Sequence, residues 1–285
     1  MRWIGGRESG NVEDRRGMSG GGMLVGGGIG TVVIALIVML LGGDPGAILS
    51  QGGGEQVVSQ APAGPQADDE AAKFTRRVLA STEDIWTDIL GREGRQYRPP
   101  TLVLFRQVTQ SGCGTATSAS GPFYCPADKK LYIDLSFYDE LAQRFGAPGD
   151  FAMAYVIAHE VGHYLQDEFG IMDQVNAARG SISRRDNNKL SVRLELQADF
   201  LAGVWAHHAN GKSFQFEQGD VEEAVRAAGA IGDDRIQQQT QGHVVPDAFT
   251  HGSSAQRVYW FSKGLKTGDL NQGDTFNSRE DANLQ

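Results

Sequence analysis

The run His159-Glu160-Val161-Gly162-His163 offers two metal ligands and a base within five residues. It lies in an apolar stretch, residues 151–165, that is typical of a helix. Two histidines four residues apart on a helix differ by about 40° around its axis, so both side chains point the same way. They can therefore bind one metal ion, with Glu160 as general base on a water that the metal carries. The pattern predicts a zinc hydrolase; the competing interpretation is a solvated helix face that carries two histidines.

A second amphipathic stretch, residues 190–209, offers the third protein ligand that a catalytic zinc needs. Glu195 and Asp199 lie four residues apart on one face of this stretch, and that face is otherwise apolar. Carboxylates are costly to bury without a partner, and a metal for one and an imidazole N–H for the other would remove that cost. We therefore expect Glu195 to be the third ligand and Asp199 to accept the free N–H of a ligand histidine.

Other assignments stay open at the level of spacing. Asp199 and Glu195 could exchange roles, or both could simply be solvated carboxylates. His207 and His208 are weaker candidates, because they lie about 120° and 220° around the same helix from Glu195. We expect them at the C-terminal end of that helix, where histidine suits the helix dipole.

His251 is a candidate for a further catalytic role. It precedes Ser253-Ser254-Ala255-Gln256-Arg257, where the sequence predicts the start of another helix. A histidine at a helix start near the metal could donate a hydrogen bond to the oxyanion of a tetrahedral intermediate. Tyr259 competes with it for this role, and a surface or structural histidine is the plainer alternative.

The elements around these residues predict an α+β domain. They are expected at residues 69–90 (helix), 101–105 (strand), 130–135 (strand) and 136–145 (helix). Asp150 is expected to cap the helix that carries the two histidines. If a strand at the edge of this sheet binds extended peptide by β-augmentation, the candidates are residues 132–135 and the loop at residues 121–124.

Residues 23–41 form a run of 19 residues without a charge. A helix of this length spans roughly 28 Å, close to the thickness of a hydrocarbon core. We expect an uncleaved transmembrane helix rather than a signal peptide, whose apolar core is usually about 7–15 residues. Because four arginines precede the run, the positive-inside rule places the N-terminus in the cytoplasm and the rest outside the cytoplasmic membrane, in the periplasm or extracellular space. These arginines are Arg2, Arg7, Arg15 and Arg16.

Composition divides the chain into five parts. They are a short cytoplasmic segment (1–22), the transmembrane helix (23–41), a flexible Gly/Pro/Gln linker (42–67), the catalytic domain (68–265) and a polar, loosely held tail (266–285). Phe276 is the expected docking point of the tail. The domain is long enough to bury a single core. The net charge of −9 and the lack of a basic stripe argue against nucleic acid as a partner.

The chain has two cysteines, Cys113 and Cys125, within a glycine-rich segment. An oxidising compartment favours a disulfide between them that closes this loop. Two free thiols are the alternative. A metal site built on them is disfavoured, because two thiolates alone do not complete a tetrahedral shell.

These motifs together resemble the bacterial family of membrane-anchored neutral zinc metallopeptidases. The resemblance rests on residues 1–3, 11–16, 121–126, 132–135, 159–163, 195–199 and 250–257. It implies a gluzincin-like, zincin-type domain in which a small sheet accompanies one helix with the two histidines and another with the glutamate. It also implies Zn²⁺ bound by His159, His163 and Glu195, and a peptide or protein substrate.

The predicted function is therefore that of a membrane-anchored zinc metalloendopeptidase, with Glu160 as the general base. The alternative is a zinc-stabilised binding module outside the cytoplasm that has no turnover. The presence of Glu160 argues against this alternative, because binding zinc needs ligands but no base. The sequence does not indicate an oligomeric state.

Overall fold

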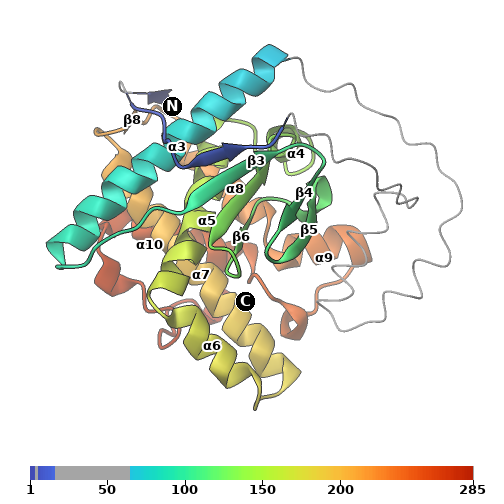
Figure 1. The fold of residues 1–285 in the computed structure, drawn as a ribbon. Coiled ribbons are helices and arrows are strands. Elements are labelled where there is room, and N and C mark those ends of the chain that lie inside the picture. Colours follow the sequence, from blue (N-terminus) through green and yellow to red (C-terminus); the bar gives the residue numbers. More distant parts are fainter. Residues whose placement is uncertain (4–5, 17–64, 285) are drawn as a thin grey trace, which may run out of the picture.

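The computed structural model describes residues 1–3, 6–16 and 65–284, and Figure 1 shows their arrangement. The strands are β1 (Arg2–Trp3), β2 (Val12–Asp14), β3 (Thr101–Phe105), β4 (Val108–Ser111), β5 (Gly114–Thr117), β6 (Phe123–Cys125), β7 (Lys130–Asp134) and β8 (Phe214–Gln215). The α-helices are α3 (Pro65–Arg92), α4 (Phe137–Gln143), α5 (Asp150–Glu168), α6 (Ile171–Arg179), α7 (Arg184–Ala209), α8 (Asp220–Ala230), α9 (Asp233–Gln241) and α10 (Ser254–Thr267).

The main sheet has four strands in the order β2-β3-β7-β6. β2, β3 and β7 are parallel, and β6 pairs antiparallel with β7 at the far edge. Since α3 connects the parallel neighbours β2 and β3, these three elements form a βαβ unit (Figure 1). The sheet therefore has its first strand near the very beginning of the chain.

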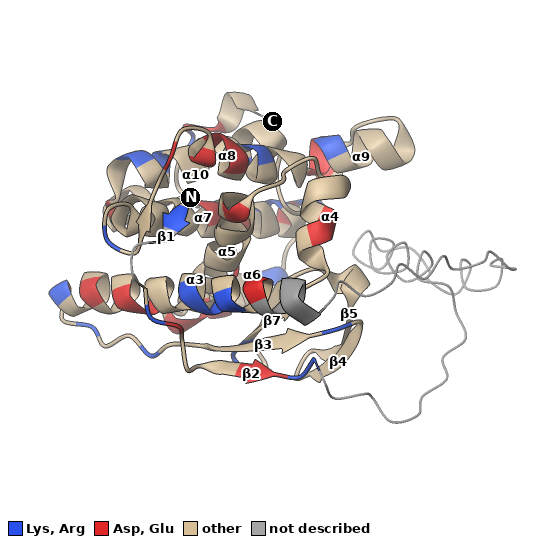
Figure 2. Ribbon diagram, turned by 90° about the horizontal axis from the view of Figure 1, so that it is seen from above, with Lys and Arg blue, Asp and Glu red and all other residues tan. Residues whose placement is uncertain are grey.

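The two faces of this sheet are buried by different partners. Alternate residues of β3 and β7 point to opposite faces, as in any strand. One set, which includes Leu102, Leu104 and Ile133, joins the main core with α3 and α5. The other set, which includes Val103 and Tyr132, forms a smaller core with residues of β5 and β6. In Figure 2 the sheet lies on one side of the molecule, and the helices lie beyond it in layers.

Helix α7 crosses the molecule between α5 and α10, and its fit against α10 depends on two glycines. A Cβ atom added to Gly203 would lie 2.1 Å from the carbonyl oxygen of Phe261. A Cβ atom added to Gly264 would lie 2.1 Å from the carbonyl oxygen of Phe200. Real Cβ atoms do not approach backbone this closely, so the two helices can pack here only because both positions lack a side chain.

The α+β class predicted from the sequence is confirmed, and the predicted helices and strands appear with small shifts in their ends. Two local predictions are wrong. Asp150 is the first residue of α5 rather than its cap, and the N–H of Phe151 is bound instead by the carboxylate of Glu223 at 3.3 Å. The strand at residues 132–135 is not an edge, because β7 lies between β3 and β6.

The sequence also predicted that residues 1–22 form a segment separate from the domain. For the residues of this segment that the structure describes, that prediction is wrong. β1 pairs with β8, and β2 is a strand of the main sheet. The three residues of β2 escape sequence analysis because two of them are acidic. The predicted transmembrane helix (23–41) lies outside the described residues, as does the linker (42–67) except for its last three residues, which already belong to α3. Within the described ranges, no helix has both the length and the apolar character that a membrane crossing requires.

The C-terminal tail is docked rather than loosely held. Asp281 is fully buried, and both of its carboxylate oxygens lie 2.8 Å from Nη1 of Arg193 on α7. Gln256 of α10 donates a further hydrogen bond to the same carboxylate at 2.8 Å. Thr275, also fully buried, donates to the carbonyl oxygen of Arg193. Buried polar bonds therefore hold this segment, and hydrophobic patterning does not reveal them.

Candidate metal centre

Three side chains from two helices converge on one point. His159 and His163 come from α5 and Glu195 comes from α7, and one ligand atom of each lies within 4.8 Å of the others. His159 Nε2 is 3.2 Å from one carboxylate oxygen of Glu195, and His163 Nε2 is 3.5 Å from the other. Among the described residues, this is the group of histidines, cysteines and carboxylates that can hold a metal ion.

These distances fit a zinc ion. Zinc binds imidazole nitrogen and carboxylate oxygen at roughly 2.0–2.1 Å in tetrahedral geometry, which places neighbouring ligand atoms about 3.4 Å apart. The two nitrogen–oxygen distances, 3.2 and 3.5 Å, lie on either side of that value. Two imidazoles and one carboxylate also leave the fourth position open, as catalytic zinc sites do.

The cluster also attracts positive charge. Burial lowers the pKa of His159, but the nearby carboxylate of Asp199 and the hydrogen bond with Glu195 outweigh it and raise the pKa to about 10. Burial opposes the ionisation of Glu195, yet the positive charges of His163 and His251 bring its pKa well below its ordinary value. A site that favours a cation this strongly is suited to a divalent metal.

Asp199 orients the first histidine from behind. Its carboxylate is completely buried, and one oxygen lies 2.9 Å from His159 Nδ1, so the Nε2 atom is turned toward Glu195. Arg257 of α10 binds both oxygens of Asp199 at 2.9 Å, and Tyr155 donates its hydroxyl to one of them at 2.6 Å. These partners compensate the buried charge of Asp199, which needs no metal of its own.

Gln166 orients the second histidine. Its amide oxygen lies 2.9 Å from His163 Nδ1, which leaves Nε2 to face Glu195. Its amide nitrogen donates to the carbonyl oxygen of Leu194 at 2.7 Å and to Gln197 at 3.1 Å. Gln166 is completely buried, and its single side chain links a histidine of α5 to the residue of α7 that directly precedes Glu195.

Glu160 lies beside the cluster and is 8% exposed. Burial raises its pKa, while the positive charges of His163 and His159 act in the opposite direction. A hydrogen bond from the backbone of Tyr124, in β6, also favours its charged form. The edge strand of the sheet therefore passes next to the carboxylate that was predicted as the base.

The two candidates for stabilising an oxyanion, His251 and Tyr259, lie in different surroundings. His251 lies close enough to Glu195 for its charge to affect that carboxylate, and its Nδ1 is 3.2 Å from an oxygen of Asp233. The other oxygen of Asp233 accepts backbone N–H groups from Thr250, His251 and Gly252 and fixes this loop. By contrast, the hydroxyl of Tyr259 is bound to Glu280 at the surface, 2.5 Å away.

A glycine within the motif sets the separation of the two ligand-bearing helices. A Cβ atom added to Gly162 would lie 3.0 Å from both Cα and the carbonyl oxygen of Ala198, on α7. This contact lies between the two histidines on one helix and between Glu195 and Asp199 on the other. Any larger residue would push the two halves of the cluster apart.

Cys113 and Cys125 form a disulfide. It joins the turn after β4 to the end of β6, where Cys125 is fully buried in the smaller core. His207 and His208, the weaker ligand candidates, lie in the last turn of α7, where they bind the carbonyl oxygens of Leu265 and Gly268.

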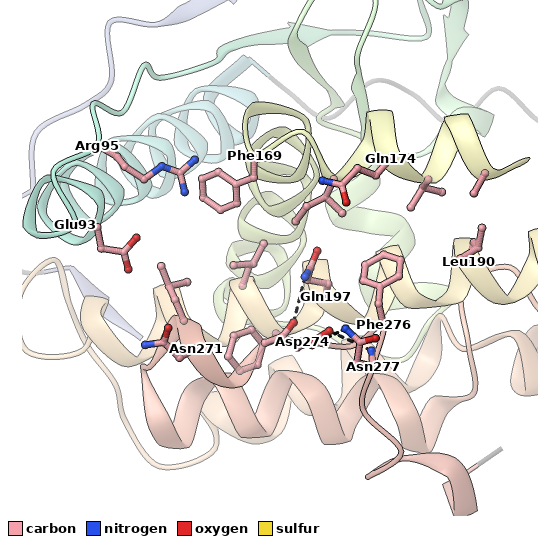
Figure 3. A pocket seen from close by; sticks show the side chains of 17 residues that line it. Glu93, Arg95, Phe169, Gln174, Leu190, Gln197, Asn271, Asp274, Phe276 and Asn277 are labelled. Atoms are coloured by element: carbon pink, nitrogen blue, oxygen red, sulfur yellow. Dashed lines mark hydrogen bonds between the residues drawn. The ribbon is translucent and has the colours of Figure 1, made fainter.

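A cavity lies apart from this cluster. It has a volume of about 570 Å³ and is enclosed by α6, α7 and the C-terminal tail, with Phe276 in its wall. Figure 3 shows Gln197 reaching across from α7 to the tail, where it donates to the carbonyl oxygen of Gly273 at 3.1 Å. Arg95 lies over the ring of Phe169 at one end. None of the three clustered ligands lines this cavity.

Sequence analysis did not identify three residues that bind the side chains or the loop of this site. Gln166 follows His163 by three residues, and that helical spacing could have revealed it. Arg257 lies in a segment that carried the family resemblance, but its partner is 58 residues away in the chain. Asp233 carries an ordinary helix-start signal, which says nothing about the loop that it binds.

Comparisons with known proteins agree with this chemistry. A family model described as "Putative neutral zinc metallopeptidase" matches residues 1–276. The uncharacterized protein YpfJ of Escherichia coli is 50% identical over 290 aligned residues, which cover 97% of this chain and 99% of that protein. The uncharacterized protein Rv2575 of Mycobacterium tuberculosis is 39% identical over 259 residues, which cover 83% and 84% of the two chains. No solved structure matches significantly. The family implies zinc as the metal for the cluster.

Proposed function

The chain belongs to this family of neutral zinc metallopeptidases, and from that premise we propose that it is a zinc-dependent metalloendopeptidase that hydrolyses peptide bonds. The observation that carries the proposal is the convergence of His159, His163 and Glu195, with Glu160 beside them. Zn²⁺ held by these three ligands would polarise the scissile carbonyl and acidify a water. The remaining chemistry belongs to side chains of the protein.

Glu160 is the general base in this proposal. Its carboxylate takes a proton from the attacking water and delivers it to the leaving amine, so the same group acts first as base and then as acid. Burial raises its pKa above that of an exposed glutamate, which makes it a better proton acceptor at neutral pH. A binding module would need the three ligands but would have no use for this carboxylate.

His251 stabilises the charge that develops on the carbonyl oxygen of the substrate. Asp233 engages its Nδ1, which leaves Nε2 to donate toward that oxyanion. The three backbone N–H groups that bind Asp233 hold this loop in place before substrate arrives. The surface position of the Tyr259 hydroxyl supports His251 over Tyr259 for this role.

The substrate binds as an extended peptide along β6. This strand forms an edge of the sheet, and the backbone of Tyr124 within it contacts Glu160. Peptide added to such an edge would bring its scissile bond next to the base. Of the two segments predicted for β-augmentation, the segment at residues 121–124 is the one that this arrangement supports.

We also propose that the domain acts outside the cytoplasm and that residues 23–41 attach it to the cytoplasmic membrane. The disulfide between Cys113 and Cys125 supports an oxidising compartment. The uncharged run of 19 residues supports contact with a bilayer.

The decisive test uses the full-length chain in detergent, because a chain that begins at Asp68 would lack β2. The parent and its Glu160→Gln variant are incubated with an unbiased peptide mixture, and the zinc content of both is measured. We expect zinc in both proteins, cleavage by the parent, and a rate at least about 100-fold lower in the variant, as expected for loss of a general base. Zinc in both proteins without cleavage by either would favour the binding module. Equal cleavage by both would remove Glu160 from the mechanism.

A further inference from the structure

Residues 6–16 are held firmly against the domain. Their backbone is hydrogen-bonded to α3 on one side and to β3 on the other. The N–H of Ser9 donates to the carbonyl oxygen of Arg76 in α3, and the N–H of Leu102 in β3 donates to the carbonyl oxygen of Asn11. The N–H of Arg15 donates to Leu104 at the other end of β3, at 2.8 Å. β2 lies between these points, paired in parallel with β3. The segment is therefore a regular part of the sheet.

A buried carboxylate on α3 organises the same segment. Glu83 is 3% exposed and accepts hydrogen bonds from Arg7 at 2.6 Å, Ser9 at 2.5 Å and Asn11 at 2.8 Å. A charge this deeply buried is costly unless its partners are present. Removing residues 6–16 would leave Glu83 without these three bonds, so α3 and the N-terminal segment fold as one unit.

The arginines used to predict membrane orientation have partners within this fold. Arg2 pairs with Glu217 at 2.8 Å, and Arg7 pairs with Glu83 and with Asp84. Arg15 pairs with Glu13 at 2.5 Å, and Arg16 pairs with Asp14 at 2.6 Å. Their accumulation before residues 23–41 is explained by these ion pairs, so it no longer indicates which end of that run faces the cytoplasm.

The βαβ unit fixes the topology of the insertion. The end of β2 and the beginning of α3 lie at the same end of the molecule in both ribbon views (Figures 1 and 2), and residues 17–64 are inserted between them. If residues 23–41 crossed a membrane once, β2 and β3 would be on opposite sides and could not pair. Two crossings need about 40 apolar residues. Beyond the run that ends before Asp44, the uncharged runs left in the insertion are residues 45–54 and 56–64, and both are too short for a second crossing.

We infer that the N-terminal segment and the metallopeptidase domain lie on the same side of the membrane, and that the chain meets the lipid bilayer from that side alone. The inference rests on the pairing of β2 with β3, and it replaces the predicted single-pass topology. It rests on the proposed function in one respect only, namely that residues 23–41 contact a membrane.

The test compares two single-cysteine variants of the full-length chain in bacterial spheroplasts. Gly10→Cys reports on the N-terminal segment and Gly180→Cys reports on the domain. Both positions are exposed, and a Cβ atom at either one meets nothing within 4 Å. A membrane-impermeant maleimide is added before or after permeabilisation with detergent. The parent, whose two cysteines form a disulfide, provides the background.

We expect both variants to be labelled to the same extent before permeabilisation. Labelling of both only after permeabilisation would also support the shared side, but it would overturn the proposed location outside the cytoplasm. Labelling of one variant before permeabilisation and of the other only afterwards would overturn the inference. If Gly10→Cys does not accumulate, Glu8→Cys, at a side chain that is 39% exposed, gives the same readout.

Discussion

Each histidine of the metal cluster has its two ring nitrogens committed to different partners. Asp199 engages one nitrogen of His159 and Gln166 engages one nitrogen of His163, so the free nitrogens face Glu195. These contacts hold both rings in place, so the rings need not reorient when a metal binds. The two partners differ in kind, because Asp199 is a charge compensated by Arg257, whereas Gln166 is a neutral amide.

Replacing Gln166 by methionine, which preserves its volume but cannot accept a hydrogen bond, should weaken zinc binding by about 10–100-fold. The reason is that His163 would lose the acceptor that holds its Nδ1 proton. Affinity is measured by competition with a chromophoric chelator, and ¹⁵N NMR of His163 reports the tautomer. Gln174→Met, in the cavity wall on α6, is the matched control. If Gln166→Met lost stability but kept the zinc affinity and tautomer of the parent, Gln166 would be a structural residue only.

At the scale of single residues, helical spacing in the sequence predicted more of the metal site than arguments about buried charge did. The positions of His159, His163, Glu195 and Asp199 follow from helical periodicity, and the structure brings all four together. The roles of Glu195 and Asp199 were open on spacing. In the structure Arg257 donates to both oxygens of Asp199 at 2.9 Å but lies 3.8 Å from Glu195, whose oxygens face the two histidines instead. No local signal indicates such a long-range partner.

At the scale of elements, the site depends on how closely α5 approaches α7. The contact between Gly162 and the backbone of Ala198 brings the helices together at the level of the ligands. The contact of α7 with α10 at Gly203 and Gly264 then places Arg257 behind Asp199. Small residues at these crossings are therefore part of the metal site, although they touch no metal ligand.

Gly162→Ala should lower the free energy of unfolding by about 1–3 kcal/mol, because the added methyl group meets backbone rather than a flexible side chain. It should also weaken zinc binding, since the two helices must separate. Gly91→Ala, at an exposed position of α3 where a Cβ atom meets nothing within 4 Å, should instead stabilise the protein by about 0.5–1 kcal/mol. Denaturant unfolding and chelator competition on both variants check this difference in sign. A Gly162→Ala variant with the zinc affinity of the parent would show that the approach is not needed.

The elements that were predicted correctly have strong periodicity of their own. α3 and α7 are long helices, α5 is an apolar helix that is buried on almost every side, and β3 and β7 are strands with almost no exposed side chain. β2 was missed because three residues with two carboxylates carry no strand signal, and its place in the sheet depends on pairing with β3. The mistaken edge at residues 132–135 has the same origin, since strand order is not encoded locally.

At the scale of the whole molecule, the segments at both ends of the polypeptide pack against the same domain. The N-terminal segment completes the sheet beside α3, and the C-terminal tail docks on α7 through Asp281. Division of the sequence by composition separated both segments from the domain, because each is short and polar. Composition indicates where a core lies, but it does not identify polar segments that are held by buried hydrogen bonds.

This architecture predicts that residues 17–64 are dispensable for folding. Replacing them by a Gly/Ser linker of about ten residues joins β2 to α3 by a shorter loop, which should raise the free energy of unfolding by about 1 kcal/mol through a smaller loop-closure entropy. The cleavage rate of peptides in solution should be unchanged, because no group of the metal cluster lies in the replaced segment.

The matched control begins at Pro65 and lacks β2 as well. It should be markedly less stable, since β3 loses its neighbour and Glu83 loses three hydrogen-bond partners. Equal stability of the two shortened chains, measured by denaturant unfolding, would mean that β2 contributes nothing to the fold and would also remove the basis for placing both ends of the insertion on one side of the membrane.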